Sequence, residues 1–165
     1  EIRCEEAYID AFTMWMVRNP EWFDVVVTTN MFGDIVTDLG SVLQGGMGMA
    51  ASANIGDVHG LFEPVHGSSP KHAGKDKVNP IATIHSIQMM IEWLGMQHSD
   101  EEALQVSDLI ERAVTEHLAV GELLTYDLGG NASTSEVGSA IAERLANLLI
   151  KASEPVQSPD QPSER

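Results

Sequence analysis

The chain has 165 residues, of which 43% are apolar, so it is long enough for one domain with a hydrophobic core. Its 9 Lys and Arg residues against 25 Asp and Glu residues give a formal net charge of −16. So negative a field disfavours nucleic-acid and membrane-surface partners. The apolar runs are too short to cross a bilayer, and a single cysteine, Cys4, excludes an internal disulfide. With no signal-peptide pattern in the opening EIRCEE, these features favour a cytoplasmic protein.

The first part of the chain predicts a helix, a strand and a second helix. Residues 7–18 carry apolar side chains on most faces and should form a helix that ends at Asn19-Pro20. Residues 23–29 (FDVVVTT) are a β-branched run that is apolar on both faces, which is typical of a buried parallel strand. The segment that follows has helical apolar spacing and should end at Gly45-Gly46.

Two extended segments and a loop come next. Residues 47–55 and 60–65 are predicted to be strands or extended segments on either side of a turn. Residues 67–80 (GSSPKHAGKDKVNP) lack apolar periodicity and contain two prolines, so we expect a loop. This loop leads into a helix over residues 81–94, with Asn79 as N-cap, Pro80 at the first helical position and Gly95 closing the helix.

Two capping-box signatures predict the starts of the last two helices. One runs from Ser99 to Glu102 and opens a helix to about Val120, and the other covers residues 133–136 and opens a helix to about Lys151. The tail over 153–165 holds three of the 7 prolines and is predicted to be disordered. No linker divides residues 1–152, and helices alternating with short strands indicate the α/β class.

Two aspartates in the sequence GDIVTD form a candidate metal site. Asp34 and Asp38 lie four residues apart on a predicted helix, so their carboxylates share one face and repel each other unless a cation lies between them. Oxygen ligands of this kind suit Mg²⁺ or Mn²⁺ rather than zinc. The alternative is a solvated acidic face near a helix N-terminus. A third carboxylate is needed, and Asp10 is a candidate that spacing alone does not select.

The loop over 67–80 is a candidate phosphate site. Lys71, Lys75 and Lys77 are three of the chain's 9 basic residues and fall within seven positions. Lysines, glycines with free backbone N–H groups and a following helix N-terminus together favour a bound phosphate. The loop matches neither the P-loop nor the dinucleotide glycine fingerprint, and a solvated basic loop is the alternative.

Three stretches carry a resemblance to a known family. NMFGDIVTD, LFEPVHGSSPKHAGKDKVNP and the later DLGGNAST resemble the isocitrate/isopropylmalate dehydrogenase family of metal-dependent β-decarboxylating oxidoreductases, and the match runs from about Tyr8 to Leu145. The resemblance implies an isopropylmalate dehydrogenase-like α/β fold. Residues 1–152 would be the C-terminal half of a two-domain subunit, followed by the tail.

For the metal, the resemblance implies Mg²⁺ or Mn²⁺ held by Asp34 and Asp38. Asp10 would complete the site from the partner subunit of a homodimer and would also face the substrate. The helices expected over 7–18 and 81–94 are too apolar to be two-sided surface helices, so one or both should bury a face against a partner chain.

For the cofactor, the resemblance implies a loop that wraps NADP or NAD. The residues carried over are His66, Gly67, Ser68, Ser69, Pro70, Lys71, His72, Ala73, Gly74, Val78 and Asn79. Family members that use NAD usually have Asp-Ile after the proline, whereas this chain has Lys71-His72. These residues would attract the 2′-phosphate of NADP, so the sequence favours NADP, with a lysine that merely offsets the acidic surface as the alternative.

The implied activity is NAD(P)-dependent oxidative decarboxylation of a malate-type 2-hydroxy acid. The best label is 3-isopropylmalate-like, with isocitrate, homoisocitrate, tartrate and D-malate as alternatives. No catalytic residue of the chain is assigned, because the family's catalytic lysine and tyrosine are expected upstream of Tyr8, and the chain alone is expected to be inactive. An interpretation of another class is a non-catalytic subunit that binds metal and nucleotide or forms dimers. A lysine and a tyrosine in upstream gene sequence would favour the enzyme.

Overall fold

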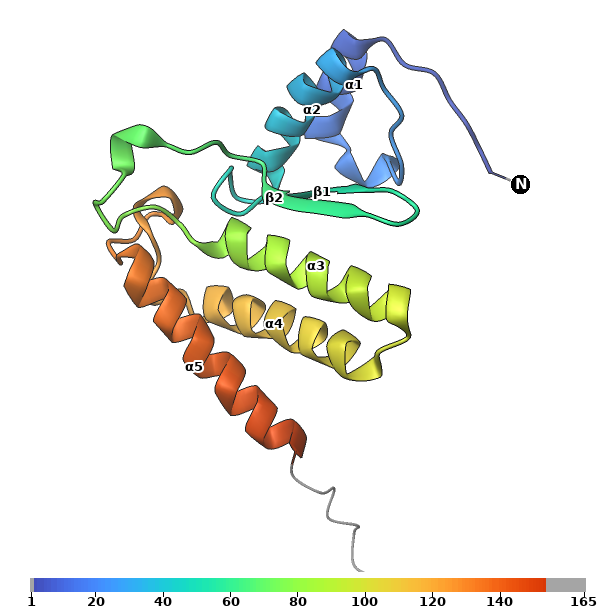
Figure 1. Cartoon of the computed structure of the whole chain (residues 1–165). Coiled ribbons are helices and arrows are strands. Elements are labelled where there is room, and N and C mark those ends of the chain that lie inside the picture. The colour runs from blue at the N-terminus through green and yellow to red at the C-terminus, as the bar shows by residue number, and fades with distance from the viewer. Residues whose placement is uncertain (1, 154–165) are drawn as a thin grey trace, which may run out of the picture.

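Three long helices enclose the core of the molecule in a computed structural model that describes residues 2–153. These helices are α3 (Ile81–His98), α4 (Glu101–Val120) and α5 (Thr134–Ser153). Figure 1 shows α4 packed between the other two. The fully buried cluster between them consists of aliphatic side chains from all three helices, namely Ile81, Ala113, Val114, Val137, Ile141 and Leu148.

A two-stranded hairpin covers the opposite face of α3. Strands β1 (Ala51–Ile55) and β2 (Gly60–Pro64) pair antiparallel, with Ala51 opposite Pro64 and Ile55 opposite Gly60. Phe62 packs against Trp93 of α3, with ring centroids 5.9 Å apart. The predicted strand over 47–55 is therefore shorter than expected, because residues 47–49 form turns.

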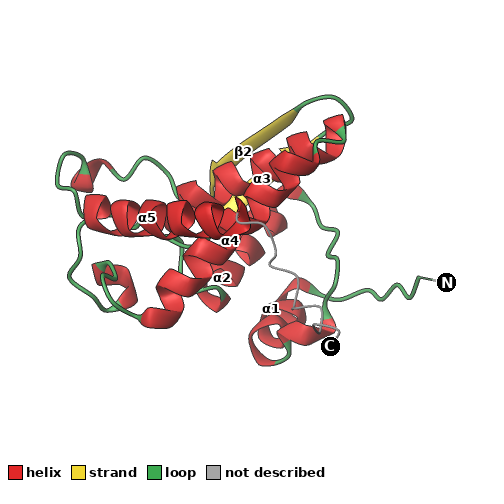
Figure 2. Ribbon diagram, turned by 90° about the horizontal axis from the view of Figure 1, so that it is seen from below, coloured by secondary structure: helices red, strands yellow, loops and turns green. Residues whose placement is uncertain are grey.

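The N-terminal helices form a separate pair beyond the hairpin in Figure 1, and in Figure 2 α1 lies apart from α3, α4 and α5. Helix α1 (Ile9–Arg18) packs against α2 (Asn30–Leu43), and the short 3-10 helix η1 (Pro20–Trp22) follows α1. Both α-helices lie where the sequence predicts them, and α2 ends before Gly45 and Gly46, which have φ angles of +106° and +107°. Glycine adopts such angles without strain.

The strand predicted over residues 23–29 is wrong. Within residues 2–153 the only strand ladder is the β1–β2 hairpin, so this run has no neighbouring strand with which to pair. Phe23 packs edge-on against Phe12, with ring centroids 4.8 Å apart, but Val25 and Val27 are 85% and 94% exposed. A β-branched pattern indicates that a segment suits a buried position in a sheet, but residues 2–153 contain no strand beside which this segment could lie.

The connection between α3 and α4 also differs from the prediction. Helix α3 continues through Gly95 to His98. Gly95 lets α4 approach closely, since a Cβ there would lie 2.9 Å from Leu104 Cδ2. Ser99 takes a left-handed conformation at the end of α3. Asp100 rather than Ser99 is therefore the N-cap of α4, and its carboxylate accepts a hydrogen bond of 3.1 Å from the Ala103 amide.

The capping box that opens α5 is confirmed. The Ser133 amide donates to Glu136 Oε2 at 2.8 Å, and the Glu136 amide donates to Ser133 Oγ at 3.2 Å. Helix α5 runs to Ser153, one residue into the segment predicted to be a disordered tail, and the rest of that segment lies outside the described residues. No helix in the described part of the chain is long and apolar enough to cross a membrane.

One side chain holds the start of α3 against two distant segments. Asn79 is 6% exposed and accepts a 2.9 Å hydrogen bond from the Ile81 amide. The N-cap of α3 is Pro80 rather than the predicted Asn79, and the first helical residue is Ile81 rather than Pro80, so the helix begins one residue later than predicted. The side-chain amide nitrogen of Asn79 donates to Asp127 Oδ2 at 3.1 Å. Gly48 fits against this pair because it has no side chain: a Cβ there would lie 2.6 Å from Asp127 Oδ2.

His117 in α4 gives the fold a dependence on pH. The side chain is 1% exposed, and its burial lowers the pKa below the ordinary value of 6.5. A backbone hydrogen bond at Leu123 raises the pKa and nearby Arg144 lowers it, but burial dominates. The unfolded chain therefore binds a proton at His117 more readily than the folded chain does.

We predict that the free energy of unfolding decreases as the pH falls from about 6.5 through the lowered pKa of His117. Urea titrations between pH 5 and pH 8, a range of about three units around the ordinary histidine pKa, measure this slope. In His117→Gln the slope should shrink by up to about one proton per molecule. His59→Gln changes an exposed histidine in the hairpin connection and is the matched control. An unchanged slope in His117→Gln would contradict the assignment.

Candidate functional site

A hollow of about 720 Å³ opens where three connecting segments meet. One segment joins α2 to β1, the second is the loop after β2, and the third joins α4 to α5. All three are brought together by the Asn79 contacts described above. The lining residues are Gly45, Gly46, Met47, Gly48, His66, Gly67, Ser68, Ser69, His72, Ala73, Gly74, Asp76, Lys77, Val78, Asn79, Tyr126, Asp127 and Thr134.

The loop after β2 follows an irregular path that exposes its backbone. Ser69 has a φ angle of +44°, and a 3-10 helix, η2 (Pro70–His72), follows it directly. Gly74 has a φ angle of +71°, and a Cβ there would meet no atom within 4 Å. The amides of His72, Ala73 and Lys75 donate within the loop, whereas that of Gly74 has no backbone acceptor among the described residues and is available to an anionic ligand.

An aromatic stack with a lysine forms one wall of the hollow. The rings of His72 and Tyr126 are stacked with centroids 5.9 Å apart, and Tyr126 lies in the 3-10 helix η3 (Tyr126–Leu128). Lys77 Nζ lies 4.4 Å from the centroid of the Tyr126 ring. Nδ1 of His72 is buried and has no hydrogen-bond partner among the described residues, so it is available to a ligand in the hollow.

The lysines of this loop carry uncompensated positive charge. In residues 2–153 the ion pairs are Arg3–Glu5 and Arg112–Glu116, so Lys71, Lys75 and Lys77 pair with no carboxylate there. In a protein with a net charge of −16, three unpaired lysines within one loop create a local positive field. Such a field favours phosphate groups.

Nine of the eleven residues predicted to bind the cofactor line this hollow, and Pro70 and Lys71 do not. Lys71 is exposed on η2, so the structure does not bring it to the hollow with the others. His66 is half-buried, with Nδ1 2.9 Å from the Gly67 carbonyl oxygen. The Asn79 side chain is committed to the fold, which leaves its backbone and the surface of its side chain to contact a ligand.

The predicted metal ligands lie on the N-terminal helix pair. Asp34 and Asp38 are both exposed on α2, and Asn30 Nδ2 donates to Asp34 Oδ2 at 3.3 Å. Asp10 is exposed in the first turn of α1, where its carboxylate accepts a 2.8 Å hydrogen bond from the Ala11 amide. The structure does not bring the three together: residues 2–153 contain no group of three acidic, histidine or cysteine side chains able to hold a metal ion.

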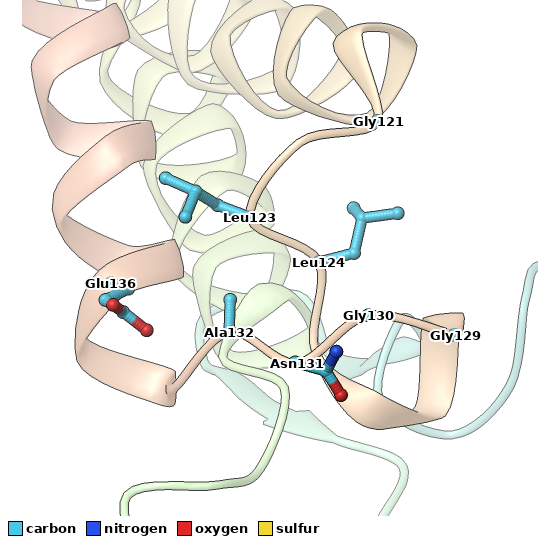
Figure 3. Close-up of a pocket in the computed structure, with 8 residues that line it drawn as sticks. All are labelled: Gly121, Leu123, Leu124, Gly129, Gly130, Asn131, Ala132 and Glu136. Atoms are coloured by element: carbon cyan, nitrogen blue, oxygen red, sulfur yellow. The ribbon is translucent and has the colours of Figure 1, made fainter.

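A second hollow, of about 400 Å³, lies along the connection between α4 and α5 (Figure 3). Leu123 points toward α5 in this view, whereas Leu124 points to the other side of the chain. The one ionisable side chain in its lining is Glu136, whose pKa is lowered by hydrogen bonds from the backbone and side chain of Ser133. A carboxylate already committed to a helix cap offers little chemistry to a ligand.

Several other residues that line the hollow are not predicted from the sequence. Gly45 to Gly48 predict only a helix stop and a weak strand, and neither Asp76 nor Tyr126 has a predicted role. Asp127 and Thr134 fall in the DLGGNAST stretch of the resemblance, which assigns them no ligand contact. The repeated turn residues around Tyr126 were the available signal, but a contact over more than fifty positions has no local sequence pattern.

Comparison with known proteins gives the family. The sequence pattern of the isocitrate/isopropylmalate dehydrogenase family matches residues 1–141. The chain is 49% identical over 145 residues to a 3-isopropylmalate/3-methylmalate dehydrogenase of Methanocaldococcus jannaschii, covering 88% of the chain and 41% of that protein. It is 46% identical over 148 residues to a homoisocitrate dehydrogenase of the same organism, covering 90% of the chain and 40% of that protein.

Solved structures agree. An isocitrate dehydrogenase from Methylococcus capsulatus superimposes with a TM-score of 0.75 at 44% identity, over 83% of this chain and 39% of the other. An apo beta-decarboxylating dehydrogenase from Thermococcus kodakarensis gives 0.75 at 40% identity, over 93% of this chain and 43% of the other. The chain spans about two fifths of the length of these relatives, and over that span it has the isopropylmalate dehydrogenase-like fold. This chain therefore belongs to the isocitrate/isopropylmalate dehydrogenase family.

Proposed function

We propose that this chain supplies the metal-binding and nucleotide-binding parts of an NAD(P)-dependent dehydrogenase that oxidises and decarboxylates a malate-type 2-hydroxy acid. The observation that carries the proposal is the hollow lined by the loop after β2, with unpaired lysines around it, in a chain of this family. Relatives named 3-isopropylmalate, homoisocitrate and isocitrate dehydrogenases support the reaction class.

The nucleotide would lie in the hollow beside the stacked rings of His72 and Tyr126. Backbone N–H groups of the loop would donate to its phosphates, and the aromatic wall would exclude water from one side of the ligand. Lys77, placed over the Tyr126 ring, adds a positive charge at the same wall. When bound, the nucleotide would supply the acceptor for the substrate's hydride.

A divalent cation, Mg²⁺ or Mn²⁺, would be held by Asp34 and Asp38 of α2, with Asp10 from the partner subunit. The three carboxylates are exposed oxygen donors of the type that these ions prefer, and none forms an ion pair among residues 2–153. When bound, such an ion polarises the substrate oxygens and stabilises the negative charge left by decarboxylation. The role of the aspartates is to hold it while the substrate's hydroxyl and carboxylate bind.

For the substrate we propose a 3-isopropylmalate-like acid, with isocitrate, homoisocitrate, tartrate and D-malate as alternatives. The relatives at 49% and 46% identity have different substrates in their names, so similarity over this segment does not separate them. Turnover of each acid by the protein at its full length decides among them.

We predict that Asp38→Asn weakens Mn²⁺ binding by at least about tenfold, because it removes a charged oxygen ligand from the site. Isothermal titration calorimetry with MnCl₂ on the full-length protein measures the affinity. Asp57→Asn makes the same charge change at an exposed position in the hairpin connection and should leave the affinity unchanged. Equal titrations for the parent and Asp38→Asn would contradict the assignment of the ligand.

Asp10 gives a linked prediction about assembly. Exposed apolar side chains remain on both proposed interface helices, including Met14 and Val17 of α1 and Met90 and Met96 of α3. We expect a homodimer in sedimentation velocity, and we expect Asp10→Asn to weaken Mn²⁺ binding in that dimer. A well-folded monomer at high protein concentration would contradict the dimer and, with it, the contribution of Asp10 across subunits.

We predict that the full-length protein binds NADP more tightly than NAD, because lysines beside the adenosine ribose would form charge-assisted bonds with the 2′-phosphate. Lys71→Ala and Lys77→Ala should each lower NADP affinity by about tenfold while changing NAD affinity less. Fluorescence titration with both nucleotides measures the two affinities.

Lys75 provides the matched control for this prediction. Like Lys71 it is exposed in the same loop and does not line the hollow, but the family resemblance gives it no contact with the nucleotide, so Lys75→Ala removes one positive charge without a proposed contact. It should lower the affinities for the two nucleotides equally. A parent protein that prefers NAD, or a preference unchanged in both Lys71→Ala and Lys77→Ala, would contradict the NADP assignment.

A further inference from the structure

Asp76 ties the loop after β2 to the N-terminus of α5. Its carboxylate accepts a 3.0 Å hydrogen bond from the Ser135 amide and a 2.8 Å bond from Ser135 Oγ. Its backbone carbonyl accepts a third bond, of 3.1 Å, from the Thr134 amide. The residue holds a left-handed conformation, with a φ angle of +47°. Asp and Asn adopt this conformation more readily than most side chains do.

These bonds join the loop to α5, beside the contacts of His72 and Lys77 with Tyr126. Within the loop, the amides of His72, Ala73 and Lys75 donate to carbonyls only three residues earlier. A further bond to α5 comes from Thr134 Oγ1, which donates to the Val78 carbonyl at 2.5 Å. The hydrogen bonds at Asp76 and Val78 therefore help to position the lysine-bearing segment against the start of α5.

The charge of the Asp76 carboxylate also favours its contact with the start of α5. Asp76 lies between Lys75 and Lys77 in the chain and lines the hollow, where an unengaged negative charge would repel a phosphate. Its oxygen accepts bonds from Ser135 at the positive end of a helix that runs over twenty residues. The negative charge is thus offset by the helix terminus, and the neighbouring lysines stay unpaired in residues 2–153.

We propose that Asp76 is a positioning residue for nucleotide binding, which acts by fixing the loop after β2 to the first turn of α5. This inference rests on the proposed function, because it concerns the same hollow. According to this inference, the affinity for the nucleotide depends on hydrogen bonds from Ser135, a residue that does not itself line the hollow.

The test compares three variants of the full-length protein with its parent. Asp76→Gly removes the acceptor and keeps the left-handed conformation free of strain. Asp76→Asn keeps an acceptor oxygen and the same conformational preference, but it removes the charge. Ser135→Ala removes only the hydroxyl donor. Asp108→Ala removes an acid from an exposed position on α4 outside the hollow and is the control for net charge.

Two measurements are made on each protein. Calorimetric titration with NADP and with NAD gives the affinities, and amide hydrogen exchange without nucleotide reports the protection of residues 67–78. We expect Asp76→Gly to lower the affinities for NADP and for NAD by about tenfold each. Ser135→Ala should also lower both affinities, but by a smaller factor than Asp76→Gly does. Asp76→Asn should recover most of the parent's affinity and protection, and Mn²⁺ affinity should stay unchanged in all of them.

Other results would overturn the inference. If Asp76 only repelled phosphate, both Asp76→Gly and Asp76→Asn would bind NADP more tightly than the parent does. If its role were confined to general stability, nucleotide and Mn²⁺ affinities would fall together. A parent protein that binds neither nucleotide would overturn the proposed function and the nucleotide part of this inference. Hydrogen exchange in the unliganded proteins would still decide whether Asp76 anchors the loop.

Discussion

The arrangement of the hollow beside the loop after β2 depends on a single buried amide. Asn79 joins the first turn of α3 to Asp127, which lies 48 positions later, and both groups pack against Gly48. Three segments that are far apart in the chain thereby meet at one point. Because a buried polar group that loses its partner destabilises the folded state by about 1–3 kcal/mol, this junction is strongly specified. The hollow lies between the three connecting segments that meet at this junction.

Charge is distributed in the molecule so that one loop differs from the rest. The chain carries 25 acidic residues, yet the lysines around the hollow have no carboxylate partner among residues 2–153. One acid within the loop, Asp76, is bonded instead to Ser135. A globally negative surface repels polyanions, whereas a small local field can still hold one phosphate-bearing ligand, because screening limits each charge to about 8–10 Å at physiological salt.

The helices could be predicted from sequence because their signals are local. Ser133 and Glu136 cap α5 as their spacing indicates, and α3 begins within one residue of its predicted start. The N-cap predicted at Ser99 lies at Asp100 instead, since the two positions offer similar side chains and Ser99 takes the left-handed conformation that ends α3. The predicted strand over 23–29 failed for a different reason: a strand exists only with a neighbour, and sequence propensity does not say whether one is present.

The candidate site was predictable in part. The loop after β2 and most of its lining residues follow from the motif, whereas the stacking of His72 on Tyr126 and the approach of Lys77 depend on contacts between distant segments. Lys71 illustrates the limit, because its neighbour His72 faces the hollow while Lys71 itself is exposed on η2. Adjacent residues in a 3-10 turn point in different directions, so a motif does not by itself say which side chain meets the ligand.

The valines at 25–27 have a consequence for handling the protein. An extended β-branched segment with uncovered backbone groups is a template on which a second chain can pair, and it contains no proline or lysine to discourage such pairing. The acidic surface opposes close approach between copies at low ionic strength, and added salt screens that repulsion. Salt concentration therefore sets the balance between colloidal repulsion and strand-to-strand association wherever these valines are left uncovered.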